Sequence, residues 1–140
     1  MAVRKKIPCS SGIFSVTFTC ACWLPLFEIT NGYDFVYKFF DKLKSKGHFV
    51  NAYVIMPNHV HAILSFTHTE KSINRILGDG KRFITYALIQ NLQANHRSDI
   101  LEKLSSFVND TDKKEENCMK HLSHPLIGRN VIQMILWNKN

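Results

Sequence analysis

The chain has 140 residues, of which 45% are hydrophobic, and its 18 Lys and Arg outnumber its 11 Asp and Glu to give a formal net charge of +7. This length predicts one domain, and the hydrophobic content is that of a globular protein. No stretch reaches the roughly 18 uninterrupted apolar residues of a membrane span, which excludes a transmembrane protein. The positive surplus favours a polyanionic partner such as nucleic acid, although a basic globular protein without one fits the charge equally well.

The first predicted element is a β-strand over residues 13–20. Apolar and hydroxyl residues alternate there, so one face holds Phe14, Val16, Phe18 and Cys20 and the other holds Ser15, Thr17 and Thr19. A period of two is typical of a half-buried strand and not of a signal-peptide core, so we expect a cytoplasmic protein. Cys20 and Cys22 would then be reduced thiols, because no second pair accompanies them to form a zinc site.

A helix and a β-hairpin are predicted next. Residues 33–46 repeat large apolar side chains at three- and four-residue steps, which is the period of an amphipathic helix, and Gly47 ends the run. Two short apolar runs, residues 48–56 and 59–66, flank the turn pair Pro57-Asn58 and are predicted to be the strands of a hairpin.

The histidines of the second hairpin strand are candidate metal ligands. Side chains alternate along a strand, so His59 and His61 share one face. The opposite face is a core face formed by Val60, Ala62, Leu64 and Phe66. Two imidazoles held two residues apart on a rigid strand form a bidentate site that needs a third ligand from elsewhere. The alternative is that both are ordinary half-exposed strand histidines.

A short helix is predicted over residues 72–77 and a longer one over residues 81–92, separated by a loop at Gly78-Asp79-Gly80. This loop, ahead of Lys81 and Arg82, would expose backbone N–H groups and positive charge together, which favours binding to phosphate. A solvated helix start without a ligand is the alternative.

The remainder of the chain completes an α+β pattern. Residues 97–108 predict an amphipathic helix, residues 109–120 predict a charged loop, and residues 121–140 hold four apolar side chains at helical spacing, namely Val131, Ile132, Ile135 and Leu136. The order strand, helix, strand, strand, helix is most of a ferredoxin-like split βαβ fold, with an antiparallel sheet and helices packed on one face. A final strand should follow, but the pattern does not place it.

Residues 53–61, Tyr-Val-Ile-Met-Pro-Asn-His-Val-His, resemble the signature of the single-tyrosine HUH transposases. This family includes the REP-associated tyrosine transposases and the insertion-sequence-200-like enzymes of bacterial mobile elements. The resemblance implies one transposase-like domain over residues 1–140, DNA transposition and recombination as its function, and single-stranded or hairpin DNA as its partner. It also implies a homodimer, and it places the segment with Lys81 and Arg82 near the DNA.

The same resemblance implies roles for individual residues. His59 and His61 would hold a divalent ion, Mg²⁺ or Mn²⁺, that acts as a Lewis acid and orients the scissile phosphate. Gln90 would be the third ligand. Tyr86 would be the nucleophile, and its 5′-phosphotyrosine link would store the energy of the broken bond for the rejoining step.

The chain departs from the family pattern after Tyr86. No tyrosine follows it, whereas the family nucleophile lies on a later helix. Residues 109–140 are therefore expected to be a divergent, poorly packed tail. Three classes stay open: an active transposase, a DNA-binding remnant or domesticated copy without the nucleophile, and an unrelated metal hydrolase that uses His59 and His61. We predict metal and DNA binding without a full cycle of cleavage and rejoining.

Overall fold

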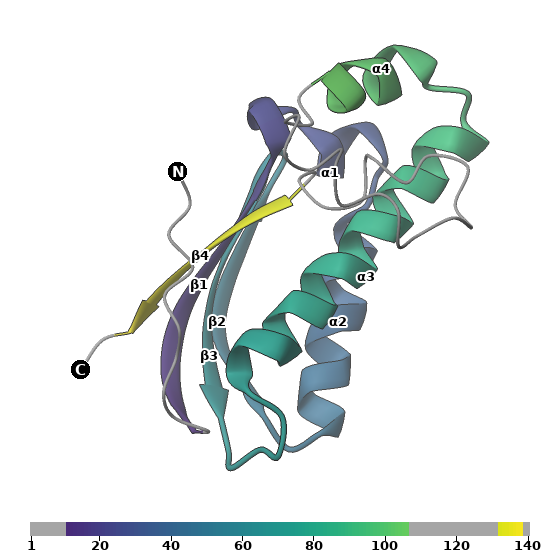
Figure 1. Cartoon of the computed structure of the whole chain (residues 1–140). Helices are drawn as coiled ribbons and strands as arrows, with labels where there is room; N and C mark the ends of the chain where they lie inside the picture. Colours follow the sequence, from purple (N-terminus) through teal and green to yellow (C-terminus); the bar gives the residue numbers. More distant parts are fainter. Residues whose placement is uncertain (1–10, 107–131, 139–140) are drawn as a thin grey trace, which may run out of the picture.

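The computed structural model describes residues 11–106 and the backbone of residues 132–138. An antiparallel sheet in the order β2-β3-β1-β4 is formed by β1 (Gly12–Cys20), β2 (Phe49–Met56), β3 (His59–Phe66) and β4 (Ile132–Asn138). The long helices α2 (Tyr33–Ser45) and α3 (Ile73–Ala94) lie side by side on one face of the sheet (Figure 1). This is the α+β, ferredoxin-like architecture that the sequence predicts.

Three short helices complete the described elements. The 3-10 helix η1 (Ala21–Trp23) and α1 (Leu26–Ile29) connect β1 to α2, and α4 (Ser98–Ser106) follows α3. All three lie at the same end of the molecule (Figure 1). In the described ranges, no helix combines the length and the apolar character needed to cross a bilayer.

One row of side chains from the central strands fills the space between sheet and helices. On β1 and β3 these residues are at most 4% exposed, and they are Phe14, Val16, Phe18, Cys20, Val60, Ala62, Leu64 and Phe66. The helices cover them with buried side chains that include Val36, Phe39, Phe40, Leu43, Ile73, Leu77, Ile84, Leu88 and Leu92. Each such burial contributes about 1.5–3 kcal/mol for a large apolar side chain. This layer therefore fixes which residues of each strand face away from the helices.

The predicted break at Gly78-Asp79-Gly80 is wrong, because all three residues lie inside α3. The helix begins at Ile73, and its first turn is capped because the Ser72 hydroxyl accepts a hydrogen bond from the backbone N–H of Arg75 at 3.2 Å. Gly80 is buried against the Phe39 ring of α2, and a Cβ at Gly80 would overlap that ring. This glycine serves the close approach of two helices and not an anion-binding loop.

The helix predicted within residues 121–140 is also wrong where the structure describes it. Residues 132–138 form β4, whose register with β1 runs from Cys20 opposite Ile132 to Phe14 opposite Asn138. The apolar spacing fits a helix, but β1 has a second edge whose N–H and C=O groups pair with this segment as a strand. β4 is the final strand of the fold. Residues 109–131 of the predicted tail lie outside the described residues.

Candidate functional site

The face of the sheet opposite the helices carries the histidine pair. His59 and His61 lie on β3, directly across from Thr19 and Thr17 of β1. Their ring centroids are 4.8 Å apart and the ring planes meet at 82°. His59 is half-buried and His61 is exposed. The strand thus brings the two imidazoles together on one face, open to ligands from solvent.

Hydrogen bonds orient both rings. Nδ1 of His59 lies 2.6 Å from Oδ1 of Asn58, and Nδ1 of His61 lies 2.9 Å from Oγ1 of Thr17. An amide oxygen only accepts, so Nδ1 of His59 donates and its Nε2 keeps a lone pair. A proton donated from Nδ1 of His61 to the Thr17 hydroxyl has the same effect. Partners of this kind orient metal-binding histidines, and the tautomer of His61 that carries its proton on Nδ1 leaves both Nε2 atoms as ligands.

The protonation state of His59 also suits a ligand. Its burial, together with the neighbouring His61, lowers the pKa of the His59 imidazole from its ordinary value of 6.5. The neutral ring therefore dominates at pH 7, and the neutral ring is the form that binds a metal ion.

The imidazoles of His59 and His61 can supply two of the ligands of a divalent ion. Within residues 11–106 and 132–138, no group of three His, Cys, Asp or Glu could hold a metal ion. Two imidazole nitrogens suit manganese as well as the later transition metals, and such ions complete their coordination with water and substrate phosphates. His59 and His61 therefore fit an ion whose remaining ligands come from outside this pair.

The structure does not bring Tyr86 and Gln90 to the histidine pair. Both residues lie on α3, where Tyr86 is half-buried and Gln90 is exposed. This helix packs on the core face of the sheet, whereas His59 and His61 lie on the opposite face. Within a single chain, the sheet separates the candidate nucleophile and third ligand from the candidate metal site.

Lys81 and Arg82 also lie on α3, about two turns beyond its first residue. Lys81 is half-buried and Arg82 is exposed. Backbone N–H groups at this depth in a helix are bonded within it, so the predicted combination of free amides and cations is not formed. Any contact with phosphate at this position would come from the two side chains alone.

Sequence reasoning missed Trp23, which lies beside the histidine pair. Trp23 is 66% exposed, and its ring centroid is 6.1 Å from that of His59 in an edge-to-face arrangement at 79°. The backbone is left-handed at both Cys22, with φ of 56°, and Trp23, with φ of 55°. Left-handed residues other than glycine leave no clear sequence signal, so the position of Trp23 could not be predicted from the sequence.

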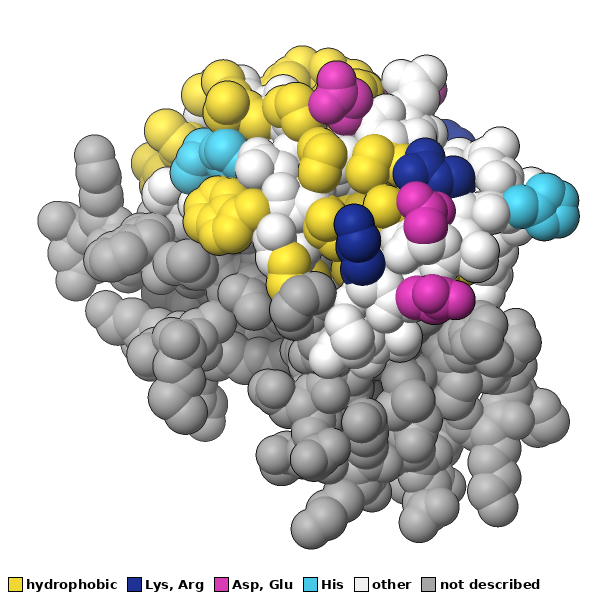
Figure 2. Space-filling model, turned by 90° about the horizontal axis from the view of Figure 1, so that it is seen from above, with side chains coloured by type: hydrophobic (Ala, Val, Ile, Leu, Met, Phe, Trp, Pro, Cys, Tyr) yellow, Lys and Arg dark blue, Asp and Glu magenta, His cyan; other side chains and the backbone are white. Residues whose placement is uncertain are grey.

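Exposed apolar side chains surround the imidazoles. Met56 of β2 lies opposite His59 and Val54 lies opposite His61. These two residues are 42% and 53% exposed, and Ile63, two positions after His61 on β3, is 43% exposed. A view onto this end of the molecule shows a histidine side chain among hydrophobic ones (Figure 2). The described neighbours of the pair are therefore apolar on the β2 side and hydroxyl-bearing on the β1 side.

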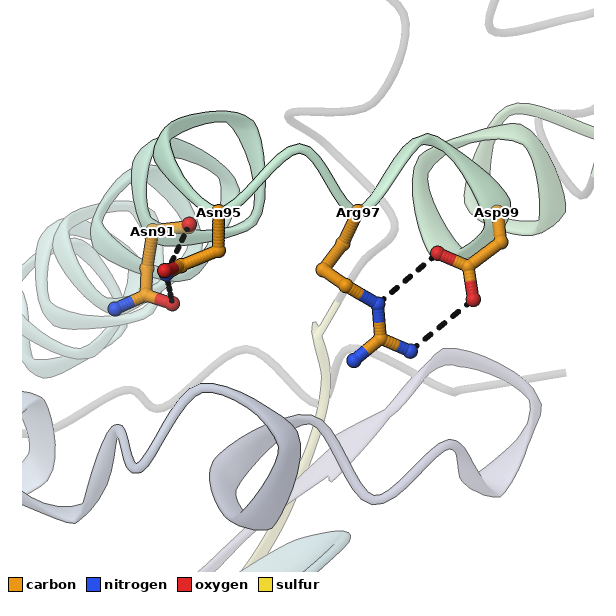
Figure 3. A network of polar contacts seen from close by, with 4 residues as sticks. All are labelled: Asn91, Asn95, Arg97 and Asp99. Atoms are coloured by element: carbon orange, nitrogen blue, oxygen red, sulfur yellow. Dashed lines mark hydrogen bonds and ion pairs between the residues drawn. The ribbon is translucent and has the colours of Figure 1, made fainter.

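A polar network at the corner between α3 and α4 has a structural role (Figure 3). The Asn95 side-chain amide donates to the backbone oxygen of Asn91 at 2.9 Å and to its Oδ1 at 3.0 Å. Arg97 donates to both carboxylate oxygens of Asp99, at 3.0 and 3.1 Å, which lowers the pKa of that carboxyl. This guanidinium is engaged in a local ion pair, so we do not assign it to a binding site.

Comparisons with known proteins indicate the fold. The sequence matches no protein-family model and no curated protein. The structure of a REP-associated tyrosine transposase bound to a REP hairpin is similar with a TM-score of 0.50 and 20% sequence identity, covering 62% of this chain and 53% of that one. The chain thus spans about half the length of that protein. A putative transposase from Deinococcus radiodurans R1 has a TM-score of 0.52 and 12% identity, covering 99% and 87% of the two chains. The chain shares its fold with these transposases.

Proposed function

We propose that this protein is a transposase-like protein that binds single-stranded or hairpin DNA and holds Mg²⁺ or Mn²⁺ at His59 and His61. The observation that carries the proposal is the pair of adjacent imidazoles on one strand face, each with a hydrogen-bond partner at Nδ1. Support comes from the shared fold with two transposases, one of them bound to a DNA hairpin, and from the net charge of +7. Counterion release makes such a charge favour nucleic acid.

The residues of the chain itself prepare this site. A divalent ion held there would polarise a phosphate oxygen as a Lewis acid. Asn58 and Thr17 restrain the two rings through Nδ1, and the lowered pKa of His59 favours its neutral form.

The geometry favours DNA binding without a complete catalytic cycle in one chain. Cleavage and rejoining through a phosphotyrosine need a tyrosine hydroxyl beside the scissile phosphate, yet Tyr86 lies behind the sheet and no tyrosine follows it in the sequence. Tyr86 could reach a histidine pair only in a second copy. Gln90, one helical turn away on the same face, would accompany it there as a third ligand.

The edge of the sheet formed by β2 supports a homodimer. Its sequence, FVNAYVIM, carries no charged residue, and most of its side chains are exposed. Edge strands of monomeric proteins usually carry charges, proline or a covering element, because an uncharged edge pairs readily with another strand. We propose that two copies pair through β2.

Calorimetry with Mn²⁺ tests the metal site. We expect the wild type to bind one ion and His59→Ala to lose most of that affinity, because one imidazole alone is a weak ligand. His96→Asn is the matched control, since His96 is exposed on the loop between α3 and α4. Equal binding by all three proteins would remove the metal proposal.

Incubation with single-stranded hairpin DNA and Mn²⁺, followed by a denaturing gel, tests catalysis. We expect DNA to bind without forming a covalent adduct. An adduct that Tyr86→Phe abolishes while DNA binding persists would identify Tyr86 as the nucleophile. Mixing Tyr86→Phe with His59→Ala would then show whether the tyrosine acts in a partner, because only action between two copies restores the adduct in the mixture.

A further inference from the structure

We propose that Trp23 is a stacking platform for an unpaired base of the DNA strand whose phosphate lies at the histidine pair. This inference rests on the proposed function, because it takes single-stranded DNA as the ligand of the open face of the sheet. It goes beyond that function by naming the residue that holds a base there. The supporting observations are the position of Trp23, its exposure and the way its loop is fixed.

The position of Trp23 suits a nucleotide that spans the site. Its ring centroid is 6.1 Å from that of His59, and the two rings meet edge to face. The two ring planes are nearly perpendicular, at 79°, and the indole keeps 66% of its surface exposed, so ring surface remains open to a base. A base lies one sugar away from its own phosphate. A strand with a phosphate at the imidazoles therefore carries a neighbouring base within reach of the indole.

Packing in the hydrophobic core does not explain the position of Trp23, because this side chain lies outside the core. The indole is 66% exposed, although burial of so large an apolar ring would stabilise the fold. Two successive left-handed residues, Cys22 and Trp23, hold it in this position. Such backbone conformations are costly for residues other than glycine and persist where the surrounding structure imposes them, often at binding sites.

The loop that carries Trp23 is tied to the histidine hairpin. The backbone N–H of Cys20 donates to the carbonyl of Asn58 at 2.9 Å, and the N–H of Phe27 donates to the carbonyl of Pro57 at 3.0 Å. These bonds flank Trp23 on both sides and join its loop to the turn that precedes His59. The indole and the imidazoles thus form one unit, which lowers the entropic cost of holding a base beside a phosphate.

The chemistry of this surface favours a single strand over a duplex. Stacking requires an accessible base face, which paired and stacked bases in a duplex do not offer. The neighbouring exposed residues Met56, Val54 and Ile63 are apolar and suit further base contacts, while the phosphate binds at the histidines. Aromatic stacking of this kind is tolerant of sequence, so any base preference would come from elsewhere.

Binding of an oligothymidine of about twelve nucleotides, within the usual site size of such proteins, tests the proposal. We expect Trp23→Ala to weaken binding by roughly ten- to a hundred-fold and Trp23→Phe to retain most of the affinity. The matched control is Tyr37→Ala. Tyr37 is 42% exposed on α2, on the side of the sheet opposite the histidines. We expect this control to bind like the wild type.

Fluorescence gives a second readout. The chain has two tryptophans, so Trp137→Phe leaves Trp23 as the only source of tryptophan emission. We expect the oligonucleotide to quench this emission and a single abasic position facing the indole to relieve the quenching. Equal affinity of Trp23→Ala and wild type would overturn the proposal while leaving DNA binding intact. If the wild type binds no Mn²⁺ but Trp23→Ala still weakens DNA binding, the metal site alone is overturned. If the wild type binds no DNA, both proposals are overturned.

Discussion

Consecutive residues of β3 face two different environments. Leu64 is 1% exposed in the core beneath the helices, whereas Ile63 beside it is 43% exposed on the face that carries the histidines. The core face tolerates neither polar groups nor changes of volume, because it is closely packed against α2 and α3. The open face has no such constraint. One strand can therefore specify the fold with one set of residues and a ligand site with the other.

The largest expected effect separates these two faces directly. Leu64→Ala should lower the free energy of unfolding by about 3 kcal/mol, because it removes buried methyl groups and leaves a cavity. Ile63→Ala, its matched control on the open face, should cost less than about 1 kcal/mol. Urea denaturation of both variants measures the difference. Similar losses from the two substitutions would mean that the open face is also buried.

The two glycines of α3 allow the same comparison of a packed position with an open one within a single helix. Gly80→Ala should destabilise the protein by about 2 kcal/mol, because the new methyl group would overlap the Phe39 ring and force the helices apart. In the part of the chain that the structure describes, a Cβ at Gly78 would meet no atom within 4 Å other than its own helix backbone, so Gly78→Ala should stabilise the protein by about 1 kcal/mol. Thermal unfolding of both variants checks this. If both substitutions change the free energy of unfolding in the same direction, the packing of Gly80 against Phe39 does not decide its effect.

Replacing Lys81 and Arg82 with alanine tests whether the helix face also contacts DNA. Each phosphate contact that is lost should reduce the slope of log affinity against log salt by about 0.7 for a single strand. Binding measured between low and moderate salt gives that slope. An unchanged slope would restrict DNA to the open face, since α3 lies on the other side of the sheet.

The smallest expected effect is the pH dependence that a buried histidine contributes. His48 is 5% exposed, and its burial lowers the pKa of the imidazole below 6.5. The unfolded chain therefore takes up a proton before the native state does, so stability should fall as the pH drops below about 6.5. His48→Asn should flatten this dependence in denaturation curves between pH 5 and about 7. A dependence as steep as in the wild type would assign it to other groups.

Sequence patterns predict those parts of this molecule that follow local rules. The alternation along residues 59–66 identifies both the core face of β3 and the side chains opposite it. The apolar repeat between residues 33 and 46 likewise predicts α2. Strands and helices with one buried face carry this periodicity because burial alternates with the geometry of the backbone.

The errors arise where distant segments decide the outcome. Gly80 resembles a helix breaker in the sequence. Its presence inside α3 is explained by the close approach of the Phe39 ring, which leaves no room for a Cβ. Residues 132–138 have helical spacing, and only the open edge of β1 makes them a strand. The positions of Trp23 beside His59 and of Tyr86 behind the sheet depend on the three-dimensional arrangement of elements, which periodicity does not encode.

The pairing of β1 with β4 has a consequence for the order in which the chain can fold on the ribosome. β1 can pair with β3 once residue 66 has emerged, but its other edge waits for residues 132–138. At a synthesis rate of about 10 residues per second, this delay lasts roughly 7 seconds. During that interval a central strand of the finished sheet is an unpaired edge. Nascent chains on the same messenger are then exposed to mispairing with one another, and a chaperone that shields β1 would act in this window.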